Sequence, residues 1–162
     1  KVYLQVAATE LGKSSDVVLI ETQAGFTSYT LEVLEIADLI LIITTPDMTS
    51  LKNTRLLVET LEALDCKGKS RLIVNKATMP SVVKINEIPN LTQMEILSEL
   101  PLEQKELSHS LDIGVPIVRS HPKLEYSLAI EAMAKRLFVI DLARSVSKGR
   151  PKKKLFRKAK SV

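Results

Sequence analysis

Disulfides, tryptophan and long apolar runs are all missing from this sequence, and each absence narrows the class of protein. The 162 residues include a single cysteine, Cys66, so no intrachain disulfide can form. There is no apolar run of about 18 residues that would span a membrane and no secretory h-region. With no tryptophan, three phenylalanines and three tyrosines, the chain lacks aromatic platforms for stacking single-stranded nucleic acid. We therefore expect one folded domain in a reducing cytoplasm.

Acidic residues are missing from the last part of the chain. Residues 148–160 hold eight of the 23 lysines and arginines and no acid, so the remainder carries 15 basic and 19 acidic residues. This asymmetry indicates a mildly acidic folded domain with a basic interaction tail. Residues 145–162 also lack the apolar rhythm that would offset the entropy of ordering. We expect a domain over residues 1–144 and a disordered basic tail over residues 145–162.

Short apolar runs alternate with amphipathic stretches along the chain, which predicts an α/β fold. Apolar runs predict strands over residues 16–22, 39–44, 71–75 and 94–100, with extended pieces at 1–6 and 115–118. Helical spacing predicts helices over residues 30–37, 102–112 and 123–142, one that Ser50 caps, and a short one that Ser81 opens. Buried strands alternating with helices indicate a three-layer, mostly parallel sheet with helices on both faces.

The stretch DVVLIETQAG, residues 16–25, contains the first candidate site residues. Its four consecutive aliphatic residues predict a strand covered on both faces, which places Glu21 at the carboxyl end of that strand, where open α/β sheets bind ligands. A carboxylate there can hold the water shell of Mg²⁺, and Gly25 lets a loop backbone approach a phosphate. Ordinary helix-entry chemistry would use the same spacing.

The preceding residues 7–14, AATELGKS, nearly match the phosphate-binding P-loop, with Ala7 in place of its first glycine. A P-loop needs a helix directly after it, whereas a strand is predicted from Asp16. We therefore expect a polar turn over these residues.

Four segments carry a resemblance to a known family: DVVLIETQAG, TLEVLEIADLILIITTPDMTSLKNTRLLVETL, RLIVNKA and ILSELPLEQKELSHSLDIGVPIVRSHPKLEYSLAIEAMAKRL. In this order, over residues 14–138, they resemble the MinD/ParA family of deviant-Walker ATPases. The nearest branch is that of the pilus-assembly CpaE/TadZ proteins, which share the patterns TLEVL-x-x-AD and TTPD-x-x-SL-x-N-x-R. The resemblance implies a P-loop NTPase-like fold, with ATP and Mg²⁺ as cofactors.

The resemblance also implies roles for individual positions. Glu21 lies where the family has the aspartate that orders Mg²⁺ through water, and Gly25 matches the glycine that ends that switch segment. Asn75 matches the asparagine that recognises adenine. The loop that forms one wall of the family's adenine site corresponds to Pro101, Leu102 and Glu103. The segment that faces the dimer partner and the nucleotide corresponds to Pro46, Asp47, Ser50 and Arg55. Judged from their immediate sequence alone, Asn75 and Asp47 could instead cap neighbouring turns.

Two departures from the family pattern bear on activity. The family's P-loop lies about one hundred residues before the position of Glu21, and twenty residues precede Glu21 here, so the chain is either a fragment or the protein has lost that part. A glutamate in place of the aspartate shifts the carboxylate by roughly 1.5 Å, and misplacements of about 1 Å can cost about a hundredfold in rate. The sequence therefore leaves ATP hydrolysis open.

The basic tail fits two functional interpretations and one in which it only solubilises the chain. The motif KGRPKKK, with Arg150 at its centre, resembles an AT-hook that lies in a narrow DNA minor groove. The motif KKKLFRK resembles the short tails with which MinD-type proteins contact anionic membranes. Its residues are Lys152, Lys153, Lys154, Leu155, Phe156, Arg157 and Lys158.

The resemblance and the tail together define the expected function. We expect a cytoplasmic homodimer, peripheral to the inner face of the membrane, that positions a pilus or secretion assembly at a membrane or cell pole. The alternatives are a chromosome- or plasmid-partition ATPase that uses the tail on DNA, and a non-catalytic scaffold.

Overall fold

The computed structural model describes the backbone of residues 2–147 and the side chains of residues 6–140. It divides into two units, one of residues 39–141 and one that combines residues up to Asp38 with those from Leu142 onward. Most of the predicted basic tail, from residue 148, lies outside the described residues.

The unit of residues 39–141 is built on a parallel sheet of three strands, β1 (Ile40–Thr44), β2 (Ser70–Val74) and β3 (Ile96–Glu99), in the order β1-β2-β3. The strands pair from Ile40 opposite Ser70 to Thr44 opposite Val74, and from Leu72 opposite Ile96 to Val74 opposite Glu99. Parallel strands need covered faces because their crossovers place helices there. The central strand is accordingly the most buried, with Leu72, Ile73 and Val74 at most 2% exposed.

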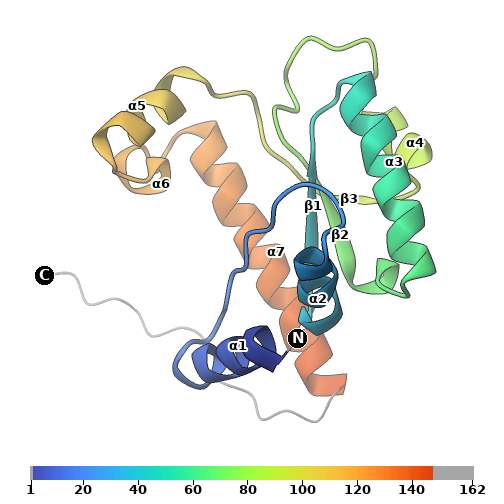
Figure 1. Ribbon diagram of the computed structural model, residues 1–162. Helices are drawn as coiled ribbons and strands as arrows, with labels where there is room; N and C mark the ends of the chain where they lie inside the picture. Colours follow the sequence, from blue (N-terminus) through green and yellow to red (C-terminus); the bar gives the residue numbers. More distant parts are fainter. Residues whose placement is uncertain (1, 148–162) are drawn as a thin grey trace, which may run out of the picture. The chain divides into compact units, whose positions relative to one another are not determined.

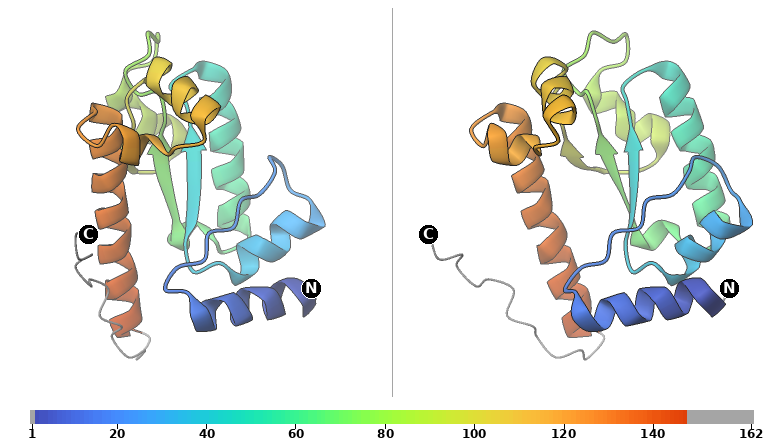
Figure 2. Two further views of the ribbon diagram at one scale, coloured as in Figure 1. Left: turned by 90° about the vertical axis from the view of Figure 1, so that its left-hand side faces the viewer. Right: turned by 60° about the vertical axis from the view of Figure 1, so that its left-hand side comes forward.

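Helices cover this sheet from two sides. Helix α3 (Met48–Ala63) lies on one side and α7 (Glu125–Ser147) runs along the other, as Figures 1 and 2 show. Leu51, Val58 and Leu61 of α3 are at most 2% exposed because they form its sheet-facing stripe. The predicted parallel α/β sheet with helices around it is confirmed.

Short elements connect these layers. They are η1 (Lys67–Lys69), η2 (Ile85–Glu87), α4 (Ile88–Thr92), α5 (Lys105–Ile113) and α6 (Ile117–Ser120). Helix α5 ends at Gly114, whose φ of +65° is the left-handed conformation that favours glycine after a helix.

The second unit contains helices α1 (Val2–Ser14) and α2 (Ser28–Ile36). Thr27 caps α2, since its hydroxyl accepts a hydrogen bond from the Thr30 N–H at 3.1 Å. Helix α2 was predicted over residues 30–37 and is found two residues earlier.

Four predictions about local structure are wrong. Residues 2–6 of the predicted extended start lie in α1, and so does the predicted polar turn at 7–14, because alanine, leucine, glutamine and glutamate there favour helix. The extended piece at 115–118 contains the start of α6. Residues 16–22 form no strand, since none of the described strands hydrogen-bonds to them, and Leu19 is 86% exposed.

Smaller differences concern helix ends. Asp47, not Ser50, caps α3, and the helix predicted to open at Ser81 begins with η2 at Ile85. Helix α7 continues through Ser147, past the predicted boundary at residue 144.

Candidate functional site

The carboxyl edge of the β1-β2-β3 sheet gathers most of the predicted site residues. The loop after β2 is bonded to both neighbours: the Asn75 N–H donates to the Thr44 carbonyl at 2.8 Å, and the Ala77 N–H donates to the Leu100 carbonyl at 2.8 Å. The Leu102 N–H donates to the Thr78 hydroxyl oxygen at 2.9 Å. These bonds bring Asn75 beside the segment of Pro101, Leu102 and Glu103, as adjacent parallel strands require.

The turn from β1 into α3 contributes Asp47 to the same edge. One Asp47 carboxylate oxygen accepts from the Ser50 N–H at 2.9 Å and the other from the Thr45 hydroxyl at 2.5 Å. The hydrogen bond from Thr45, followed by those from Ser50, lowers the pKa of Asp47 from 3.8 to about 2. Asp47 is therefore ionised throughout the physiological range and serves as the cap of α3.

Buried hydroxyl groups fix this turn to its surroundings. The Thr54 hydroxyl donates to the Ser50 carbonyl at 2.8 Å and shares a hydrogen bond with the Thr44 hydroxyl, whose oxygen lies at 2.8 Å. The Ser81 hydroxyl donates to the Pro46 carbonyl, across 35 residues of sequence. Thr44, Thr54 and Ser81 were not among the predicted site residues. The TTPD motif was a signal for Thr44 alone, because Thr54 and Ser81 lie outside it.

The predicted site side chains also make local contacts. The Asn75 side-chain oxygen accepts from the Lys76 N–H at 2.9 Å, and a Glu103 carboxylate oxygen accepts from the Glu106 N–H at 3.0 Å, inside the first turn of α5. Arg55 pairs with Glu59 on α3, with Nε and Oε1 2.6 Å apart. Each of these side chains thus has a local structural role.

Glu21 and Gly25 belong to the other unit. Both are exposed, and Glu21 stands in a segment without regular structure, so its predicted position at the end of a buried strand is wrong. Gly25 has a φ of +97°, which an L side chain rarely adopts, in keeping with a sharp change of chain direction there.

The Asn75 amide and the neighbouring apolar side chains have a chemistry that suits a planar base better than a metal ion. An amide beside a proline and a leucine offers one hydrogen-bonding edge and apolar contact for a ring. Among residues 6–140, whose side chains are described, no three acidic, histidine or cysteine side chains lie together as a metal site would need.

No helix in the described part of the chain is long and apolar enough to cross a membrane.

Two large apolar side chains are exposed to solvent at the carboxyl edge of the sheet. Val82, in the loop after β2, is 97% exposed, and Met48, in the first turn of α3, is 61% exposed. Neither residue was among the predicted site residues.

Comparison with known proteins gives relatives of one kind, although no family model matches the chain. The septum site-determining protein MinD of Synechocystis sp. (strain ATCC 27184 / PCC 6803 / Kazusa) is 29% identical over 140 residues, covering 83% of this chain and 52% of the relative. The chloroplastic minD homolog of Arabidopsis thaliana is 26% identical over 151 residues, covering 88% and 45%. The chain thus spans about half of the length of these relatives.

Solved structures share the fold. The MinD cell division protein of Aquifex aeolicus matches with a TM-score of 0.68 and 26% identity, over 82% of this chain and 57% of that chain. A ParA family ATPase from Chlorobium tepidum TLS matches at 0.61 and 22% identity, over 68% and 45%. MinD of Pyrococcus horikoshii OT3, complexed with Mg-ADP, matches at 0.66 and 17% identity, over 80% and 53%.

The parallel sheet with its surrounding helices is therefore the fold of a P-loop NTPase-like α/β protein. Sequence and fold together support the MinD/ParA-type ATPase superfamily for this chain, which confirms the prediction made from its motifs. The CpaE/TadZ branch stays a prediction.

Proposed function

We propose that this chain is a MinD/ParA-like protein of the CpaE/TadZ kind, which positions a pilus or secretion assembly at a membrane or cell pole through nucleotide-linked dimerisation. The observation that carries the proposal is the hydrogen-bonded edge that brings Asn75 beside Pro101 and Leu102. In this proposal the amide of Asn75 recognises an adenine, while Pro101, Leu102 and Glu103 form the wall of the base site.

ATP and Mg²⁺ are the proposed cofactors. Support comes from the MinD of Pyrococcus horikoshii, which was solved with Mg-ADP, and from the family motifs of this sequence. Glu21 would order the ion through water and Gly25 would end the switch segment. The bound ion would offset the phosphate charge, and the residues of this chain would supply recognition of the base.

The same edge is the proposed dimer face. Pro46, Asp47, Ser50 and Arg55 would contact the partner, as the family pattern implies. The exposure of Met48 and Val82 supports this proposal, because exposed apolar side chains at a ligand-binding edge favour burial against another protein.

The tail residues from Lys152 to Lys158 would hold the dimer at an anionic membrane surface, and two tails would bind better than one.

Titration with a fluorescent ATP analogue in the presence of Mg²⁺ tests the base site. We expect Asn75→Ala to weaken binding about tenfold, since losing a hydrogen bond worth about 1.4 kcal/mol changes an equilibrium constant tenfold. Asn90→Ala is the matched control, because Asn90 is exposed on α4, outside the proposed site, and its loss should leave affinity unchanged. Equal affinity of wild type and Asn75→Ala would contradict the proposed base site.

The metal role is tested separately with Glu21→Ala. Titrations with and without EDTA should differ for the wild type and coincide for Glu21→Ala. If chelation weakens both proteins equally, Glu21 does not hold the ion. Absence of any nucleotide binding would favour the non-catalytic scaffold over an ATPase.

A DNA-binding partition ATPase is the second candidate, favoured by the tail motif KGRPKKK with Arg150 at its centre. Binding to random duplex DNA that falls steeply between low and physiological salt, without binding to anionic vesicles, would support this candidate over membrane positioning.

A further inference from the structure

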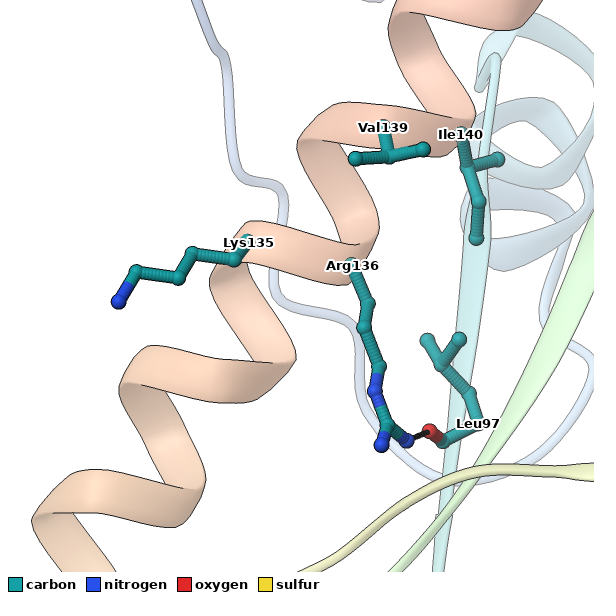
Figure 3. A pocket seen from close by; sticks show the side chains of 5 residues that line it. All are labelled: Leu97, Lys135, Arg136, Val139 and Ile140. Carbon is teal, nitrogen blue, oxygen red and sulfur yellow. Dashed lines mark hydrogen bonds between the residues drawn. The ribbon is translucent and has the colours of Figure 1, made fainter.

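Among the residues that the structure describes, no strand pairs with the outer edge of β3, whose backbone is irregular and is contacted there by a side chain from α7. Ile96 lies opposite Leu72 and Ser98 lies opposite Ile73, so Leu97 is an extra residue with no partner on β2. Such a bulge leaves the backbone groups of the extra residue outside the ladder. The Leu97 carbonyl accepts a hydrogen bond at 2.6 Å from Nη1 of Arg136, on α7 (Figure 3).

Beside this bond the surface is hollow and apolar. A cavity of about 410 Å³ is lined by Leu97, Lys135, Arg136, Val139 and Ile140, and Val139 is 66% exposed. A second hollow on the same edge is lined by β3 together with Ala129 and Ala132 of α7. In Figure 3, the Arg136 side chain runs to Leu97 while that of Lys135 points away from it.

An edge strand with unpaired backbone groups is a template for pairing with another chain. The identical edge of a second copy is the partner that fits, because a two-fold axis makes an edge self-complementary and pairs the two strands antiparallel. Apolar side chains in the hollows would add buried area to such a contact. Charged residues, bulges and covering groups are the devices that block it.

We propose that Arg136, with the Leu97 bulge, closes the outer edge of β3 against pairing with β3 of a second copy of this chain. Arg136 occupies the Leu97 carbonyl, which an incoming strand would need as an acceptor. Glu95 and Glu99 are exposed at the two ends of the strand, and their charges oppose antiparallel pairing about Leu97 as well. The Arg136 donor is the element that the test removes, because its loss leaves the Leu97 carbonyl open as an acceptor while the bulge and the two glutamates remain.

The test compares Arg136→Met, which keeps the aliphatic stem without a donor, with Arg136→Gln, which keeps an N–H donor. Sedimentation velocity over a concentration series measures self-association, and thermal unfolding confirms that each variant is folded. We expect Arg136→Met to dimerise with at least a tenfold lower dissociation constant than the wild type. Arg136→Gln and the neighbouring Lys135→Met should behave as the wild type does.

A second substitution tests whether the dimer forms through β3. Leu97→Pro in the Arg136→Met background should restore wild-type association, because proline has no N–H for an incoming strand and is tolerated at edges and bulges. Unchanged association of folded Arg136→Met would overturn the proposal. A dimer that persists after Leu97→Pro is added would also overturn it. Loss of folding in Arg136→Met alone would overturn it as well, because the contact would then contribute only to stability.

Discussion

At the scale of single residues, the carboxyl edge of the sheet is organised by short polar side chains that bond to one another and to backbone. Thr44, Thr45, Ser50 and Thr54 form one network around the start of α3, and Asp47 supplies its charge. Bonds to an ionised acceptor are stronger than bonds between neutral groups. The position of Asp47 therefore depends on its ionisation.

The stability of the protein should fall in acid through Asp47. Its pKa lies at about 2 in the folded protein, below the ordinary 3.8, so ionised Asp47 stabilises the fold above about pH 4 and loses that contribution as pH falls towards 2. Asp47→Asn keeps a good cap but does not titrate. Urea unfolding from pH 5 to pH 2 should show the stability difference between wild type and variant shrinking; a constant difference would contradict this role.

The buried hydroxyl of Thr54 should contribute more to stability than other threonine hydroxyls of α3. Thr54→Val removes the hydroxyl that bonds both the Thr44 hydroxyl and the Ser50 carbonyl, and should lower the free energy of unfolding by about 1–2 kcal/mol, because a buried polar group then lacks its partner. Thr60→Val is the control, since the Thr60 hydroxyl bonds only to the Leu56 carbonyl of its own helix among the described contacts. Equal losses in chemical denaturation would refute the importance of the Thr54–Thr44 bond.

At the scale of elements, α3 shows how one helix divides between core and solvent. Leu61 is fully buried and Leu56 is 53% exposed, although both are leucines of the same helix. Leu61→Ala should lower the free energy of unfolding by about 2–5 kcal/mol through a cavity. Leu56→Ala should change it by no more than about 0.5 kcal/mol. Denaturant titration of the two variants, with unchanged slopes, is the measurement; similar losses would mean that α3 is packed differently.

The elements that the sequence predicted well are those whose apolar pattern has an obvious partner. β1, β2 and α3 follow from apolar runs bounded by Pro46 and Asn75 and from helical spacing. Residues 16–22 have the same strand pattern, yet a strand also needs a neighbour, which local sequence does not specify. An extended segment was predicted at the start of the chain, where the structure has helix α1. The prediction failed because helix-forming residues alternate there with apolar ones over a few positions, which resembles a strand pattern.

The candidate site was predicted in part for a similar reason. Family motifs assigned Asn75 and residues 101–103 to one site, and the hydrogen bonds between their loops make them neighbours. The hydroxyl network and the Arg136 bond could not be derived from spacing, since Ser81 and Pro46, or Arg136 and Leu97, are more than thirty residues apart. Contacts of this length depend on the packing of whole elements.

At the scale of the whole molecule, charge divides the sequence into a mildly acidic part and a basic end. Eight cations and no acid lie in residues 148–160, and acidic residues outnumber basic ones elsewhere. Each cation near an anionic membrane contributes about 1 kcal/mol, and the same cations would bind DNA phosphates with strong salt dependence. Electrostatics alone therefore does not distinguish the two surfaces; the apolar pair Leu155 and Phe156 does.

Replacing both apolar tail residues should separate membrane binding from DNA binding. Leu155→Ala with Phe156→Ala removes the side chains that would enter the acyl boundary, so binding to anionic vesicles should fall while binding to random duplex DNA stays within about twofold. Leu111→Ala, at an 82% exposed leucine of α5, is the control that should affect neither. Vesicle flotation and fluorescence anisotropy provide the two measurements. If vesicle binding survives the double substitution and both interactions weaken equally with salt, the tail acts as a charge tether without insertion, and the DNA-binding candidate gains support.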